Sequence, residues 1–191
     1  MELETYLDHF EARLDRARSG GVWKLERRQH FRQPESKSWS AFARGAWEEA
    51  LRALDAAGPS VQNELGALAE LGVRVRRLRI AEWPLTPYLQ WEFHSLRIRH
   101  GHGEDIRVGT ADQVARFEDD EELPEILTVG NDTMYRILYT DDGILCGAVA
   151  HSDAELIAAC RDEIVRLHGG GTPLPEYFER YVAGLDPPNG E

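Results

Sequence analysis

The sequence predicts an α+β protein with a mixed, mostly antiparallel sheet flanked by helices and an N-terminal helical layer. Helical spacing of apolar residues dominates the chain up to Gly72. Short segments rich in branched and aromatic residues follow, and turn signals separate them. The Asp141-Asp142-Gly143 turn between the last two segments favours an antiparallel hairpin. The expected strands lie near residues 73–80, 105–109, 126–129, 133–139 and 144–150.

Helices separated by glycine and proline account for most of the N-terminal third. Residues 2–18 place their apolar side chains on one helical stripe. Residues 22–26, VWKLE, are compatible with a short strand. A second helix follows, and its expected cap is Ser38 or Ser40. The Ala-Gly-Pro sequence at 57–59 is expected to break this helix before a further short one begins.

The stretch at 73–109 carries the most distinctive pattern. Its first segment, VRVRRLRI, alternates as a strand only if the register slips once, which predicts a β-bulge near Arg76-Arg77. Trp83-Pro84 leaves the strand, because the residue before a proline avoids helical backbone angles. Thr86-Pro87 then begins an aromatic helix, which we expect to lie across the sheet.

The C-terminal part alternates loops, strands and helices. Residues 118–125 contain six acidic side chains and a proline, which predicts a solvated loop. Ser152 and Glu155 have the spacing of a capping box at the start of a helix. The glycines at 169–171 predict a flexible hinge before a last helix.

The length of 191 residues fits one domain with a sizeable core. We expect a single α+β domain over residues 1–184 and a frayed tail at 185–191. Within the domain, the expected parts are a mainly helical layer at 1–72, the sheet core at 73–168 and a C-terminal helix at 174–184.

The charge of the protein disfavours some classes of partner. The formal net charge is −12, and residues 110–191 carry 18 of the 34 acidic side chains but 5 of the 22 basic ones. An acidic surface repels the phosphate backbone, so direct nucleic-acid binding is disfavoured. A basic region of a protein partner is easier to accommodate. The sequence leaves a homodimer open.

The expected compartment is the cytoplasm. The acidic, amphipathic N-terminus differs from a secretory signal. No apolar run approaches the ~20 residues that a membrane span needs. Cys146 and Cys160 lack metal-ligand spacing and suit reduced thiols.

Binding candidates gather between residues 74 and 104. Two histidines flank a glycine in the HGHGE turn, and such side chains can bind a divalent metal, but strict ligand spacing is missing. A polar turn is therefore the favoured interpretation, and neither a metal nor a cofactor is expected. For the arginines, pairing with the chain's own acids or lining a sheet edge is favoured over phosphate contacts. The tryptophans are expected in the core, with one or two lining a pocket or an interface. The candidates are Arg74, Arg76, Arg77, Arg79, Trp83, Tyr88, Trp91, His94, His100, His102 and Glu104.

No nucleophile elbow, P-loop or dinucleotide-binding motif is present, so we assign no catalytic residue. The order of landmarks nevertheless resembles an actinobacterial family of unknown function that is often encoded beside helix-turn-helix regulators of the Xre type. These landmarks span roughly residues 20–182: WKLE, Phe42, VRVRRLRI, WPLTPYLQWEF, Gly103-Glu104, Asp141-Asp142-Gly143 and the helix from Ser152.

The closing hairpin and helix are also similar to one half of a phospholipase-D-like domain. The catalytic HxK motif of that class is missing, so the resemblance implies a degenerate sensor or adaptor without phosphodiesterase chemistry. The leading hypothesis is a cytoplasmic accessory protein that binds a transcription regulator and senses a small ligand. One alternative is an enzyme of another class with a site near His94, His100, His102 and Glu104. The weaker alternative is a DNA-binding protein that uses the arginines at 74–79.

Overall fold

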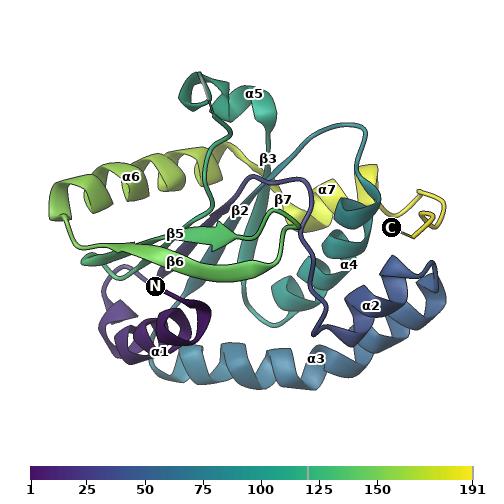
Figure 1. Ribbon diagram of the computed structural model, residues 1–191, viewed down its shortest axis with the longest axis horizontal. Helices are drawn as coiled ribbons and strands as arrows, with labels where there is room; N and C mark the ends of the chain where they lie inside the picture. The colour runs from purple at the N-terminus through teal and green to yellow at the C-terminus, as the bar shows by residue number, and fades with distance from the viewer. Residues whose placement is uncertain (120, 191) are drawn as a thin grey trace.

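A computed structural model describes residues 1–119 and 121–190, and it confirms the α+β class (Figure 1). The strands are β1 (Val22–Glu26), β2 (Val75–Ala81), β3 (Asp105–Thr110), β4 (Ile126–Val129), β5 (Thr133–Tyr139), β6 (Leu145–His151) and β7 (Thr172–Pro173). Within the described residues they form a seven-stranded sheet in the order β6-β5-β4-β1-β2-β3-β7. The β1–β2 and β2–β3 pairs are parallel and the other pairs are antiparallel, as the sequence predicted for a mixed sheet.

Helices cover both faces of this sheet. They are α1 (Leu3–Leu14), α2 (Lys37–Ala43), α3 (Trp47–Glu70), α4 (Pro87–Gly101), α5 (Ala111–Val114), α6 (Ala154–Gly170) and α7 (Leu174–Tyr181), with 3-10 turns η1 (Asp15–Arg18) and η2 (Ala115–Phe117). Helices α1, α3, α4 and α7 contribute to the apolar core on one face (Figure 1). Helices α5 and α6 pack on the opposite face. Within the described residues, no helix has the length and apolar character needed to cross a membrane.

Strand β1 lies at the centre of the sheet, although it was not among the strands that the pattern favoured most. Its neighbour β2 is also central and is buried on both faces. The predicted β-bulge in β2 is wrong, because its pairing with both β1 and β3 keeps a continuous register. Both faces of β2 are covered, and its buried side chains include charged as well as apolar ones. The strand therefore keeps a regular register without an alternation of apolar and polar residues.

Helix α3 runs through Gly58 and Pro59, so the predicted break is wrong. Leu54 and Leu65 are both buried, on either side of the proline. Tertiary packing of one long apolar stripe stabilises the helix more than its local propensity weakens it. Thr86 caps α4 as predicted, by accepting a hydrogen bond from the backbone N–H of Leu89.

Other local predictions are displaced. Ser36 caps α2, and Asp153 caps α6 in place of the Ser152 capping box. Helix α6 continues to Gly170, so the predicted hinge is mostly helical. The acidic stretch at 118–125 is a loop for most of its length, but Glu118 and Glu125 are largely shielded from solvent. Asp120 in this loop and Glu191 in the predicted tail lie outside the described residues.

Candidate functional site

A layer of buried charges lies on the face of the sheet that α3 and α4 cover. Arg77 of β2 donates from Nε to Glu104 Oε1 and from Nη1 to Glu26 Oε2, both at 2.7 Å. Arg99 of α4 binds the other oxygen of Glu104 at 2.5 Å. Burial alone would raise the pKa of Glu104, but Arg77, Lys24 and Arg99 outweigh it and hold this pKa far below its usual range. Arg77 and Glu104, two of the predicted binding residues, are therefore partners of each other.

The same layer contains a second pair, Arg79 and Glu92. Arg79 is fully buried and donates from Nε to Glu92 Oε2 at 2.6 Å. Its Nη2 donates to the carbonyl of Arg28 at 2.7 Å, which fixes the loop after β1. Tyr88 donates to Glu92 Oε1 at 3.1 Å and accepts from Gln33. Tyr88 thus lies in the interior, as does Trp91, whose Nε1 donates to Ser38 Oγ.

An aromatic and acidic cleft of about 650 Å³ opens where β2 and β3 end. We call it the Trp83 cleft; the residues that define it are Glu82, Trp83, Asp112, Tyr177 and Tyr181. Trp83 is 63% exposed, and its ring centroid lies 5.9 Å from that of Tyr181. Tyr181 in turn lies 4.8 Å from Tyr177. The carboxyl ends of neighbouring parallel strands are a common place for binding sites in α/β sheets.

The loop that carries Trp83 is held by the segment that leaves β1. Gln29 accepts from the backbone N–H of Glu82 at 2.8 Å and donates to the carbonyl of Ile80 at 3.0 Å. The carbonyl of Gln29 accepts from the Thr86 hydroxyl at 2.8 Å. These bonds fix both ends of the loop, so the exposed indole is presented by a pre-organised backbone.

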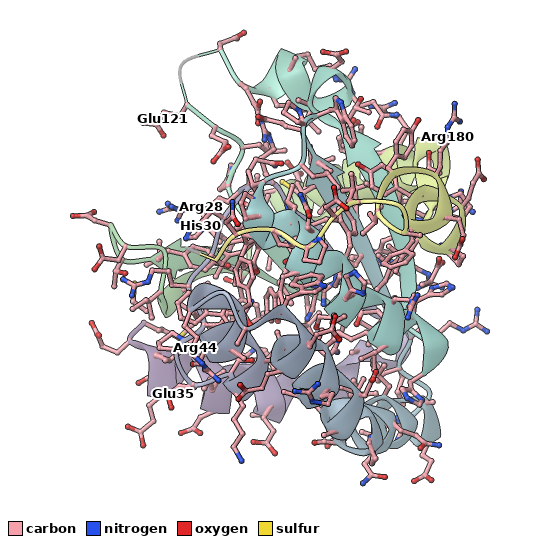
Figure 2. The ribbon with its side chains drawn as sticks, turned by 90° about the vertical axis from the view of Figure 1, so that its right-hand side faces the viewer. Arg28, His30, Glu35, Arg44, Glu121 and Arg180 are labelled. Carbon is pink, nitrogen blue, oxygen red and sulfur yellow. The ribbon has the colours of Figure 1, made fainter. Side chains whose placement is uncertain are left out.

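Carboxylates dominate the charge near this cleft. Arg27 contacts Glu82 at 2.7 Å, Glu118 at 2.7 Å and Glu122 at 3.4 Å, so three carboxylates share one guanidinium. This contact explains why Glu118 is only 14% exposed in a loop predicted to be solvated. Arg180 stacks on the Tyr181 ring at 5.2 Å and adds one cation to the rim. Figure 2 shows Arg180 pointing outward from α7, and Glu121 extending from the acidic loop.

Two adjoining cavities meet at Lys24 of β1. One, of about 470 Å³, has mainly apolar walls from α1, α3 and the sheet, among them Phe10 and Leu68. The other, of about 150 Å³, is lined by Glu26 and Glu125 as well as Lys24. In the part of the chain that the structure describes, no hydrogen bond or ion pair engages the Lys24 ammonium. Burial, reinforced by Arg77, lowers the pKa of Lys24 to about 8.

Glu125 is the second unusual group in the smaller cavity. It is 3% exposed, in contrast to the solvated loop predicted for it. Its Oε1 accepts from the backbone N–H groups of Arg27 and Arg28 at 2.8 and 2.7 Å, and its Oε2 has no partner among the described residues. Burial, followed by the charge of Glu26, raises the pKa of Glu125 to about 8.

The histidine turn does not form a cluster with Glu104. His94 packs edge-on against Trp47 and Phe178. His100 Nδ1 lies 3.0 Å from the backbone carbonyl of Glu104, while the carboxylate of Glu104 faces the arginines. His102 lies near α3, beside Gly58. Over residues 1–119 and 121–190, no three histidine, cysteine or acidic side chains are grouped closely enough to hold a metal.

The remaining candidates, Arg74 and Arg76, lie at the opposite end of β2 from Trp83. Sequence reasoning missed several residues that line cavities. Lys24 gave no signal apart from its place inside VWKLE, and pairing among strands distant in sequence decides that it faces a cavity. The missed residues are Arg18, Lys24, Glu26, Glu125, Arg161, Tyr177 and Tyr181.

The fold and these cavities define an α+β protein built on a mixed sheet, with a cleft at the carboxyl ends of its parallel strands. Residues 8–179 match the family described as a domain of unknown function, DUF6879, so the chain belongs to this family. Comparisons with curated proteins and with solved structures give no match.

Proposed function

We propose that this protein is an accessory protein that binds a basic segment of a protein partner in the Trp83 cleft. One observation carries the proposal: a 63% exposed tryptophan stands beside two tyrosines and acidic side chains on a loop that is fixed at both ends. Exposed aromatic rings attract arginine and lysine through cation–π contacts. Glu82 and Asp112 add charge complementarity, which favours cationic partners over anionic ones.

The partner we propose is a helix-turn-helix transcription regulator in the cytoplasm. Such a regulator carries lysine and arginine on the face that contacts DNA phosphates. An acidic cleft can engage that face or a basic segment next to it, and binding would then compete with DNA. The resemblance to a family encoded beside Xre-type regulators supports this partner. The resemblance to a degenerate phospholipase-D-like half, which lacks the catalytic HxK motif, supports binding rather than catalysis.

Peptide binding tests the cleft directly. The probes are fluorescently labelled hexapeptides that differ only in having two arginines, two glutamates or two glutamines. We expect the arginine peptide to bind at low salt, with an affinity that falls as salt rises because charge contributes to it. Trp83→Ala and Asp112→Asn should each weaken this binding at least tenfold.

Leu156→Ala is the matched control, because Leu156 is a 42% exposed apolar residue on α6, away from the cleft. It should bind the arginine peptide like the wild type. Equal affinity for the glutamate peptide, or wild-type affinity in Trp83→Ala, would overturn the proposal.

A second candidate function is the sensing of a small ligand at Lys24. The specific observation is an ammonium that makes no hydrogen bond or ion pair in the described chain, at the boundary of an apolar cavity of about 470 Å³. A ligand with an apolar body and a carboxylate head group matches both the apolar cavity and the ammonium. Sodium decanoate, titrated calorimetrically, is the probe.

The chain has only two lysines, Lys24 and the exposed Lys37, so the control is well matched. Lys24→Met should abolish decanoate binding and Lys37→Met should leave it unchanged. If both variants bind like the wild type, Lys24 does not hold the head group and this second function is rejected.

A further inference from the structure

An arginine-lined hollow lies at the amino ends of β1 and β2, at the far end of these strands from the Trp83 cleft. Its volume is about 480 Å³. Arg18, Arg74, Arg76 and Arg161 line it together with Trp23, and no acidic side chain belongs to its lining. We call this hollow the arginine pocket. It gathers four guanidinium groups in a protein whose net charge is −12.

None of these four arginines has an ion-pair partner in the part of the chain that the structure describes. Some arginines elsewhere are paired, for example Arg77 with Glu104 and Arg116 with Glu163. Within the described residues, neither the Trp83 cleft nor the two cavities at Lys24 gather several unpaired guanidinium groups. Like charges around one hollow repel each other unless an anion lies between them. The arginine pocket is therefore distinguished by four guanidinium groups that line one hollow without an acidic side chain among the described residues of its lining.

Two of the guanidinium groups are held in place. Arg76 lies over the Trp23 ring, 4.7 Å from its centroid. Arg161 donates to the side chain of Asn131 and to the carbonyl of Gly20 at 3.3 Å, and its Nε has no partner among the described residues. Trp23 itself is 7% exposed and donates to the same carbonyl at 3.1 Å.

The turn beneath these groups has no room for a side chain at Gly20 or Gly21. Gly20 and Gly21 have φ values of +104° and +75°. A Cβ at Gly21 would lie 3.2 Å from Arg76 Nη1, and one at Gly20 would lie 3.1 Å from Arg161 Nη2. Both guanidinium groups thus pack directly on the turn, which reduces the conformational freedom that an anion would otherwise have to restrict.

We propose that the arginine pocket binds the phosphoryl groups of a small phosphorylated molecule, with inorganic pyrophosphate as the simplest representative. Arginine makes paired hydrogen bonds to phosphate oxygens, and several guanidinium groups match two adjacent phosphoryl groups better than one carboxylate. A long phosphate backbone would extend beyond the pocket over an acidic protein, so a small ligand fits better than a nucleic acid.

Calorimetric titration with pyrophosphate at ~150 mM salt, where the Debye length is about 8 Å, tests the site. Arg18→Gln and Arg74→Gln are the informative variants, because both side chains are exposed and make no hydrogen bond within the described chain. Each should weaken pyrophosphate binding at least tenfold, and citrate should bind more weakly than pyrophosphate. Arg52→Gln is the control: Arg52 is exposed on α3, about 27 Å from the pocket end of that helix at 1.5 Å per residue.

Several outcomes would overturn the proposal. They are no binding of pyrophosphate by the wild type at millimolar concentration, wild-type affinity in the Arg18→Gln/Arg74→Gln double variant, and equal affinity for citrate. Duplex DNA that binds through the same arginines more tightly than pyrophosphate would assign the pocket to nucleic acid instead. Thermal unfolding of each variant separates lost binding from lost folding.

Discussion

Arg79 and Glu92 form a buried ion pair between the central strand β2 and the helix α4, with Nε and Oε2 2.6 Å apart. The side chain of Arg79 is 0% exposed and that of Glu92 is 7% exposed. Water cannot replace either partner there, so removing one leaves a desolvated charge. The pair therefore fixes the position of α4 on the sheet, even though its net contribution relative to an apolar pair can be small.

We predict that Arg79→Met lowers the free energy of unfolding by about 3–5 kcal/mol, because it leaves the Glu92 charge buried without its partner. The double variant Arg79→Met/Glu92→Met should regain much of that loss. Urea unfolding measures both. Arg44→Met, which removes an exposed ion pair with Glu49, is the control and should leave the midpoint almost unchanged. A double variant as unstable as the single one would contradict this account.

The sequence predicted the fold class and the α4 segment well, because their signals are local. Thr86-Pro87 begins α4 as expected, and Asp141-Asp142-Gly143 forms the turn between β5 and β6, with Gly143 at φ +81°. The break at Gly58-Pro59 failed because packing along the whole of α3 decides the outcome there. Local propensity does not report such long-range stabilisation.

The cavities were harder to predict, because residues distant in sequence form them. Trp83 was a candidate, but Tyr177 and Tyr181 reach it only through β7 and α7. The sequence predicts one group of arginines at 74–79, whereas alternation along β2 separates them. Arg77 and Arg79 face the interior, and Arg76 faces Trp23 on the other side of the sheet.

Trp91→Ala should destabilise the protein by about 3–5 kcal/mol, the range for removing a large buried aromatic side chain. Trp91 is 2% exposed and stacks on Phe42 at 5.8 Å. Trp83→Ala should leave the urea midpoint close to that of the wild type, because Trp83 is 63% exposed. Equal destabilisation by both substitutions would show that the Trp83 loop is part of the core.

The histidine turn should not bind a transition metal strongly. His100 and Glu104 face different groups, and a zinc site needs several ligands about 2.0–2.2 Å from one ion. A chelator should therefore leave the thermal midpoint unchanged, since a metal bound to the native state would raise it by mass action. A zinc-dependent rise of several degrees that is lost in His100→Ala/His102→Ala would contradict this prediction.

Glu125 should make stability fall as pH rises from about 4.5 to about 8. Its pKa is raised from 4.5 to about 8 by burial and by Glu26, so across this window the folded state holds a proton that the unfolded state releases. Rising pH then favours the unfolded state, and the loss of stability is complete above pH 8.

Glu125→Gln resembles the protonated carboxyl and keeps an oxygen for the N–H groups of Arg27 and Arg28. Urea unfolding at pH 5 should give similar stabilities for variant and wild type, whereas at pH 8.5 the variant should be the more stable. A difference between the two proteins that does not change with pH would mean that Glu125 is ionised throughout, with its unpaired oxygen satisfied by solvent.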